Sequence, residues 1–192
     1  MAKKQKPVKG TYGYLAAIKK KALKHTLLMV AIGLAVFVLG LLLNKMEATN
    51  IFTVFAFLFV LPAAKSFVSV VVLFPYQQRS AEQREKLASY AKEQDIVLYD
   101  AVFTSSERVM HLDCVYITGH QLIGFTERSK DKVSLIEEYL KKELEIRQLS
   151  YKVYIATTEK QLADRMNLRG EEKEINTALQ QEVADMMRLF MI

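Results

Sequence analysis

The stretch TLLMVAIGLAVFVLGLLL (Thr26–Leu43) contains eighteen residues without a charged side chain. At about 1.5 Å per residue, a helix of this length spans about 27 Å, close to the hydrocarbon thickness of about 30 Å. A second apolar block, Ile51–Phe74, follows after the short loop Asn44–Asn50. We expect an uncleaved anchor, because the first block is longer than a signal-peptide core and the second follows almost at once.

Positive charge is concentrated ahead of the first apolar block. Residues 1–24 contain eight lysines and no acidic residue, whereas the loop between the blocks carries one of each, Lys45 and Glu47. Because cytosolic loops are enriched in Lys and Arg, this asymmetry predicts a cytosolic amino terminus and an external loop. The second span then returns the chain to the cytosol. The sequence therefore predicts a multi-pass protein of the cell membrane with both termini cytoplasmic.

The predicted partner of the basic tail is the lipid bilayer. From Pro75 onward the chain has 17 basic and 20 acidic residues, although the whole chain carries a net charge of +6. A net negative soluble part argues against nucleic acid as a partner, because phosphate binding needs a positive surface. Anionic lipids of the inner leaflet are expected to attract the lysines at the membrane interface. These interface residues are Lys19, Lys20, Lys21, Lys24 and Lys65.

Lys65 lies inside the second apolar block, and two placements of that block give it different roles. If the span begins near Ala48, Lys65 lies about 26 Å along it, and its side chain can extend to the cytosolic headgroups. If the span covers Val54–Phe74, Lys65 lies near the midplane and needs a partner or a function. We favour the first placement because it requires no partner. Pro62 is expected to kink the helix just before the lysine.

The two spans, at about 26–43 and 48–74, are predicted to form an antiparallel helical hairpin. Facing residues in such a pair have a constant sum of residue numbers. Gly40 with Ala56 and Gly33 with Ala63 share the same sum, so these small residues are predicted to meet in one register. Small residues at a helix interface let the two backbones approach closely.

Residues 75–192 are predicted to form a compact cytosolic α+β domain with the order α-β-β-β-α-β-α-α. Ser80 and Gln83 have the spacing of a capping box at a helix start. Runs rich in β-branched and aromatic residues predict strands at 95–105, 108–118, 121–126 and 151–157. Apolar residues at helical spacing predict a helix over 131–149 and a last helix that runs from Ile175 to Phe190.

Three regions follow from these patterns. They are a basic cytosolic or interfacial segment (1–24), a transmembrane hairpin (25–74) and the α+β domain (75–192).

The stretch LDCVYITGHQLIGFTERSK (Leu112–Lys130) resembles the second and third strands of nuclease-related domains of the restriction-endonuclease-like fold. The resemblance covers roughly residues 80–157. In that family two acids bind a divalent metal and a lysine steadies the attacking water. The resemblance therefore implies Asp113 and Glu127 as ligands of Mg²⁺ or Mn²⁺, with Lys130 completing the catalytic set.

The third predicted strand departs from the Glu-x-Lys pattern of that family. Glu127 and Lys130 are three residues apart, and residues at this spacing on a strand point to opposite faces. Thr126 and Arg128 have the right spacing but lack the metal-binding acid. The departure indicates a degenerate site.

Two neighbours of Asp113 have simpler expected roles. His111 shares a predicted strand face with Asp113, and we expect that face to be an exposed polar one. Cys114 is expected on the opposite face, in the core, as an inert thiol. As the one cysteine of the chain it allows no intrachain disulfide, which fits a cytosolic domain.

Together these features favour a membrane-anchored interaction or accessory module without catalytic activity or a cofactor, which holds a protein partner of unknown identity at the inner surface. The alternative is a membrane-tethered, degenerate metal-dependent nuclease. A third functional class is a channel or transporter subunit, formed by a homo-oligomer of hairpins in which Lys65 lines a path.

Overall fold

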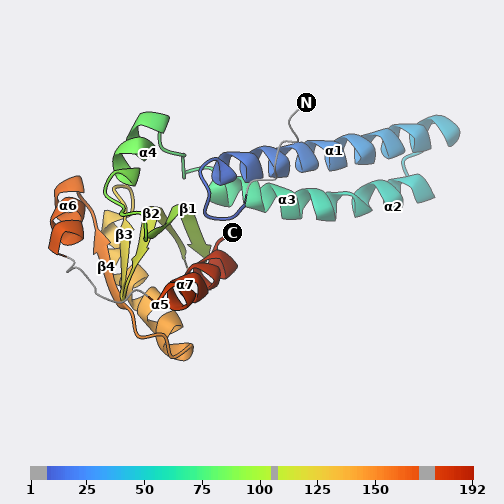
Figure 1. Cartoon of the computed structure of the whole chain (residues 1–192). Coiled ribbons are helices and arrows are strands. Elements are labelled where there is room, and N and C mark those ends of the chain that lie inside the picture. Colours follow the sequence, from blue (N-terminus) through green and yellow to red (C-terminus); the bar gives the residue numbers. More distant parts are fainter. Residues whose placement is uncertain (1–7, 105–107, 169–175) are drawn as a thin grey trace. The chain divides into compact units, whose positions relative to one another are not determined.

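The computed structural model of the chain describes residues 8–104, 108–168 and 176–192. Lys3, Lys4 and Lys6 of the predicted basic segment, and Ile175 of the last predicted helix, lie outside the described residues. The chain forms two compact units (Figure 1). The hairpin unit contains Leu15–Gln77. The sheet unit contains Gln78–Ile192 together with the residues that precede Leu15.

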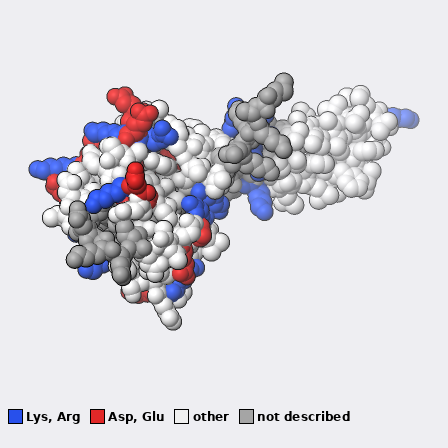
Figure 2. Space-filling model, in the orientation of Figure 1, with Lys and Arg blue, Asp and Glu red and all other residues white. Residues whose placement is uncertain are grey.

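The apolar blocks make the hairpin unit almost entirely helical. Its helices are α1 (Tyr14–Leu43), α2 (Ile51–Leu58) and α3 (Val60–Leu73). Asn50 caps the start of α2, because its side chain accepts a hydrogen bond from the backbone N–H of Thr53. Figure 2 shows a long, mostly uncharged surface over these helices. Both α1 and the stretch Ile51–Leu73 are long and apolar enough to cross a membrane.

The break between α2 and α3 lies at Phe59, three residues before Pro62. Proline has no N–H, and its ring crowds the carbonyl group four residues earlier, here that of Leu58. Regular helical hydrogen bonding is therefore interrupted, and the N–H of Phe59 donates to the carbonyl of Ala56 at 3.2 Å. The kink expected at Pro62 corresponds to this break.

The register of the hairpin differs from the predicted one by about one helical turn. A Cβ atom added to Gly40 would lie 2.4 Å from the Cβ of Phe52, and one added to Gly33 would lie 3.2 Å from the Cβ of Phe59. The predicted pairs Gly40–Ala56 and Gly33–Ala63 are therefore wrong. The physical reason is that Phe52 and Phe59 approach the two glycines most closely, with the carbonyl oxygen of Ala56 3.4 Å from a Cβ added to Gly33.

The sheet unit contains a four-stranded sheet and helices, so the predicted mixed α+β class is confirmed. The strands are β1 (Ile96–Thr104), β2 (Val109–Thr118), β3 (Gln121–Phe125) and β4 (Lys152–Ala156). They lie in the order β1-β2-β3-β4, antiparallel except for the parallel pair of β3 and β4.

Helices cover both faces of the sheet (Figure 1). They are α4 (Ala81–Ala88), α5 (Val133–Ile146), α6 (Glu159–Leu168) and α7 (Thr177–Phe190), with a short 3-10 helix η1 (Lys130–Lys132) before α5. The core under α5 and α7 includes Leu112, Ile136 and Val183, whereas the core under α4 and α6 includes Cys114 and Leu162.

The predicted start of α4 is confirmed. Ser80 accepts a hydrogen bond from the N–H of Gln83, and the side chain of Gln83 accepts one from the N–H of Ser80. This capping box pairs two backbone N–H groups that would otherwise lack partners. It fixes where the linker after α3 ends and α4 begins.

β1 and β2 contain an irregular step at Asp100 and Asp113. Asp100 has a φ of 50°, and it lies between the strand pairs Tyr99–Cys114 and Ala101–Leu112. Met110 and Leu112 lie in the α5–α7 core, but beyond the step Val115 and Ile117 do so instead. The strict alternation assumed for this strand therefore fails at Asp113, and side chains change faces there.

Residues near both ends of the chain cover the outer edge of β1. The N–H of Tyr99 donates to the carbonyl of Gly10 at 2.8 Å, and the N–H of Ile192 donates to the carbonyl of Val102 at 3.0 Å. Lys9 Nζ donates to the carbonyl of Met191 at 2.6 Å. These contacts block an edge that would otherwise offer unpaired backbone groups. They also divide the predicted segment 1–24, because its remainder from Tyr14 is helical and begins α1.

The observed hairpin register predicts one cross-link and excludes another. In a Cys114→Ala background, His25→Cys with Ser66→Cys should form a disulfide on mild oxidation, because His25 Nδ1 lies 2.7 Å from Ser66 Oγ. The matched control, His25→Cys with Val71→Cys, has the spacing of the sequence-predicted register and should stay reduced. Counting reactive thiols with a maleimide after denaturation distinguishes the two. Cross-linking of the control pair alone would contradict the observed register.

Candidate functional site

Asp113 and Glu127 lie together at the end of the β2–β3 pair. Cys114 faces Phe125 in the strand register, so Asp113 and the residues just after Phe125 are neighbours. The backbone N–H of Glu127 donates to Asp113 Oδ2 at 3.1 Å. The juxtaposition of these two acids, which the nuclease resemblance implied, is therefore present.

The guanidinium of Arg79 lies between the two acids. Its Nε donates to Asp113 Oδ1 and its Nη2 to Asp113 Oδ2, each at 2.9 Å, which makes the pair bidentate. The same Nη2 lies 2.8 Å from Glu127 Oε2. Bidentate charge-assisted pairs of this kind are among the strongest polar contacts in proteins. One cation thus pairs with both carboxylates.

Burial makes this pairing necessary. The side chain of Asp113 is 0% exposed and that of Arg79 is 12% exposed, whereas that of Glu127 is 42% exposed. A carboxylate removed from water needs a partner, because its lost hydration is worth several kcal/mol. Arg79 supplies that partner to Asp113, and Glu127 forms the solvent-facing side of the cluster.

The cluster shifts the protonation equilibria of its members. Burial alone raises the pKa of the Asp113 carboxyl, but the hydrogen bonds and charge of Arg79, together with nearby His111, outweigh it and hold the pKa below its usual value. The hydrogen bonds to Asp113 raise the pKa of the Arg79 guanidinium. Next to the cluster, burial raises the pKa of the Cys114 thiol to about 12. The thiol is therefore protonated at neutral pH, as expected for a core cysteine.

Aromatic and backbone groups surround the guanidinium. Arg79 Cζ lies 5.8 Å from the centre of the Phe125 ring, within the range of a cation–π contact. The Tyr12 hydroxyl donates to the backbone carbonyl of Arg79 at 3.0 Å, and Arg84 Cζ lies 4.9 Å from the centre of the Tyr12 ring. Arg79 is therefore held through its side chain and its backbone.

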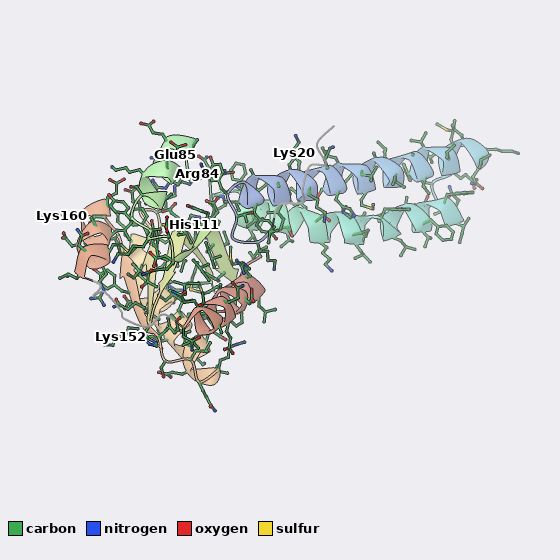
Figure 3. The ribbon with its side chains drawn as sticks, in the orientation of Figure 1. Lys20, Arg84, Glu85, His111, Lys152 and Lys160 are labelled. Atoms are coloured by element: carbon green, nitrogen blue, oxygen red, sulfur yellow. The ribbon has the colours of Figure 1, made fainter. Side chains whose placement is uncertain are left out.

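The structure does not place the other sequence-predicted residues in this cluster. Lys130 begins η1 and is exposed, so the set of Asp113, Glu127 and Lys130 is not assembled. His111 is fully buried within the sheet (Figure 3), which corrects the prediction of an exposed polar face. Helices cover both faces of the sheet, so neither face is open to solvent. Among the residues described, no three His, Cys, Asp or Glu side chains cluster as metal ligands.

Sequence reasoning missed Arg79. The residue directly precedes the capping box of α4, and no spacing rule connects it to an aspartate that lies 34 positions later. A usable signal was the aspartate within an otherwise apolar strand, because such an acid needs a cation from elsewhere in the chain.

A second candidate site is the basic end of the hairpin unit. Lys20 projects from α1 on the side away from α3 (Figure 3). The contact of His25 with Ser66 puts Lys65 at the height of the turn where the uncharged stretch of α1 begins. Lys65 therefore lies level with the start of the uncharged stretch of α1, next to the lysine-bearing part of the helix.

No family model, curated protein or solved structure matches this chain.

The shifted Asp113 carboxyl predicts a specific dependence of stability on pH. Because its pKa is lower in the folded state, it stabilises the fold above its unfolded pKa of about 3.9, and this contribution is lost as pH falls below that value. The thermal midpoint of the full-length protein should fall steeply below about pH 4. Asp113→Asn should lower the free energy of unfolding by about 3 kcal/mol at pH 7. It should also reduce the fall of the thermal midpoint with decreasing pH.

Circular dichroism melts in detergent between neutral and acid pH measure this profile. Asp164→Asn, which removes an exposed carboxylate on α6, is the control and should follow the wild type. Equal acid slopes for Asp113→Asn and the wild type would contradict the role assigned to the buried pair.

Proposed function

We propose that this chain is a membrane-anchored accessory or interaction module without catalytic activity, with its sheet unit at the cytosolic surface. The observation that carries the proposal is the occupation of the Asp113–Glu127 pair by Arg79. A divalent cation at the same carboxylates would have to share them with the Arg79 guanidinium, whose nitrogens lie 2.8–2.9 Å from their oxygens, and like charges that close repel. The acids therefore serve the fold rather than a metal.

The hairpin unit supports the membrane half of the proposal. Many of its apolar side chains face outward; Leu34 is 61% exposed and Leu61 is 70% exposed. A continuous surface of this kind is costly in water and favourable in lipid. In this proposal α1 is the first span and the stretch Ile51–Leu73 (α2 with α3) is the second. The Asn44–Asn50 loop between them is external, and the anchor is multi-pass.

The lysines define the cytosolic end and its lipid partner. Four lysines of α1 lie before the uncharged stretch, and the height of Lys65 next to them favours headgroup contact over a midplane position. Each lysine near an anionic leaflet contributes about 1 kcal/mol of attraction. These residues are Lys19, Lys20, Lys21, Lys24 and Lys65.

The nuclease alternative keeps one supporting observation, which is the direct contact of Glu127 with Asp113. The groove along the hairpin gives no support to the channel alternative. That groove measures about 600 Å³, and the described residues that line it include Thr26 and Thr53 but no charged side chain. Lys65 is not among them.

Labelling of single cysteines tests the topology. In a Cys114→Ala background, Lys45→Cys should react with a membrane-impermeant maleimide added to intact cells, because its loop is external. Lys160→Cys, on α6 of the sheet unit (Figure 3), should react only after the membrane is permeabilised. Labelling of Lys160→Cys in intact cells would exclude a cytosolic sheet unit.

Metal titration tests the absence of catalysis. Calorimetric titration of the full-length protein in detergent with Mg²⁺ or Mn²⁺ should give no saturable heat, because the Arg79 guanidinium already occupies the space between both acids. Asp113→Ala/Glu127→Ala is the matched control and should behave in the same way. Tight binding that the control loses, followed by metal-dependent cleavage of nucleic acid, would establish the nuclease alternative instead.

A further inference from the structure

The cluster around Arg79 has the form of a binding site for a planar cation. Asp113 accepts two parallel hydrogen bonds from one edge of the guanidinium, and Glu127 accepts a third. The Phe125 ring lies 5.8 Å from the central carbon. Two carboxylates thus match the donor fork that distinguishes guanidinium from other cations, and the ring adds a cation–π contact.

The ligand of this site belongs to the linker that follows α3. Arg79 lies between the hairpin unit, which ends at Gln77, and the capping box that starts at Ser80. Its backbone carbonyl accepts the Tyr12 hydroxyl. Tyr12 belongs to the segment that precedes α1. The site therefore binds the linker after α3 directly, through the Arg79 side chain. It holds the segment before α1 indirectly, through the hydrogen bond from Tyr12 to the Arg79 carbonyl.

We propose that Asp113, Glu127 and Phe125 form an alkylguanidinium receptor whose resident ligand is Arg79, and that its occupation fixes the linker and the segment around Tyr12 to the sheet. The receptor selects for shape as well as charge. A lysine ammonium or a metal ion cannot supply two parallel N–H donors from one planar group to the two oxygens of Asp113. The inference is independent of the membrane topology and of the partner of the sheet unit.

Chemical rescue in the full-length protein tests the receptor. Arg79→Ala removes the ligand and leaves the carboxylates, so it should lower the thermal midpoint in detergent. Ethylguanidinium at about ten times its Kd should then raise the midpoint by about 5 °C. Tetramethylammonium at the same concentration has the charge but no donors, and should have no effect.

The single cysteine gives a direct readout of unfolding. Cys114 is buried beside Asp113, so a fluorogenic maleimide reports its exposure as the sheet unit melts. Hydrogen exchange of the peptide that contains residues 8–14 gives a second readout. Its protection should fall in Arg79→Ala, because the linker that carries the carbonyl acceptor of the Tyr12 hydroxyl is then no longer held to Asp113 by a side chain. Ethylguanidinium refills the site but is not attached to the linker, so any return of protection would reflect the restored stability of the sheet unit alone.

Two matched variants make the outcome decisive. Arg84→Ala removes a nearby arginine that is not in the receptor, and ethylguanidinium should leave its midpoint unchanged. Arg79→Ala/Asp113→Asn removes the fork acceptor and should abolish the rescue. If Arg79→Ala does not fold alone, the yield of folded protein with and without ethylguanidinium replaces the midpoint. No rescue, or equal rescue of Arg79→Ala/Asp113→Asn or by Mg²⁺, would overturn the proposal.

Discussion

The sheet unit depends on the neutralisation of one buried carboxylate. Asp113 lies in the second strand with its side chain removed from water, and such a charge is tolerated only with a well-placed partner. The partner comes from the linker rather than from the sheet. Consequently one strand residue is tied to the linker through the Arg79 side chain, and the Arg79 backbone carbonyl in turn accepts the Tyr12 hydroxyl.

The regular elements could be predicted from the sequence because their signals are local. β-Branched and aromatic runs marked the strands, and Ser80 with Gln83 marked the start of α4. The juxtaposition of Asp113 with Glu127 was implied by the resemblance of Leu112–Lys130 to nuclease-related domains. Arg79 could not be predicted in the same way, because a side-chain pair between a linker and a distant strand leaves no periodic pattern.

Two other failures have local physical causes. The alternation of β2 breaks where Asp100 takes a left-handed backbone conformation, and period-2 reasoning has no means to detect such a step. The hairpin register was derived by matching small residues with small ones. Glycine instead leaves room for a large neighbour, and Phe52 and Phe59 take that room.

The connection between the two units has a consequence for folding. The chain leaves the sheet unit at Tyr14 and returns at Gln78, so the hairpin is an insertion within one domain. Closing a flexible loop costs an entropy that grows as about 1.5 RT ln n for n residues. Paired helices remove most of that cost in advance, because they hold Lys19 Nζ 3.5 Å from the carbonyl of Phe74. A hairpin that forms early therefore brings the two flanking segments of the sheet unit together before the sheet itself folds.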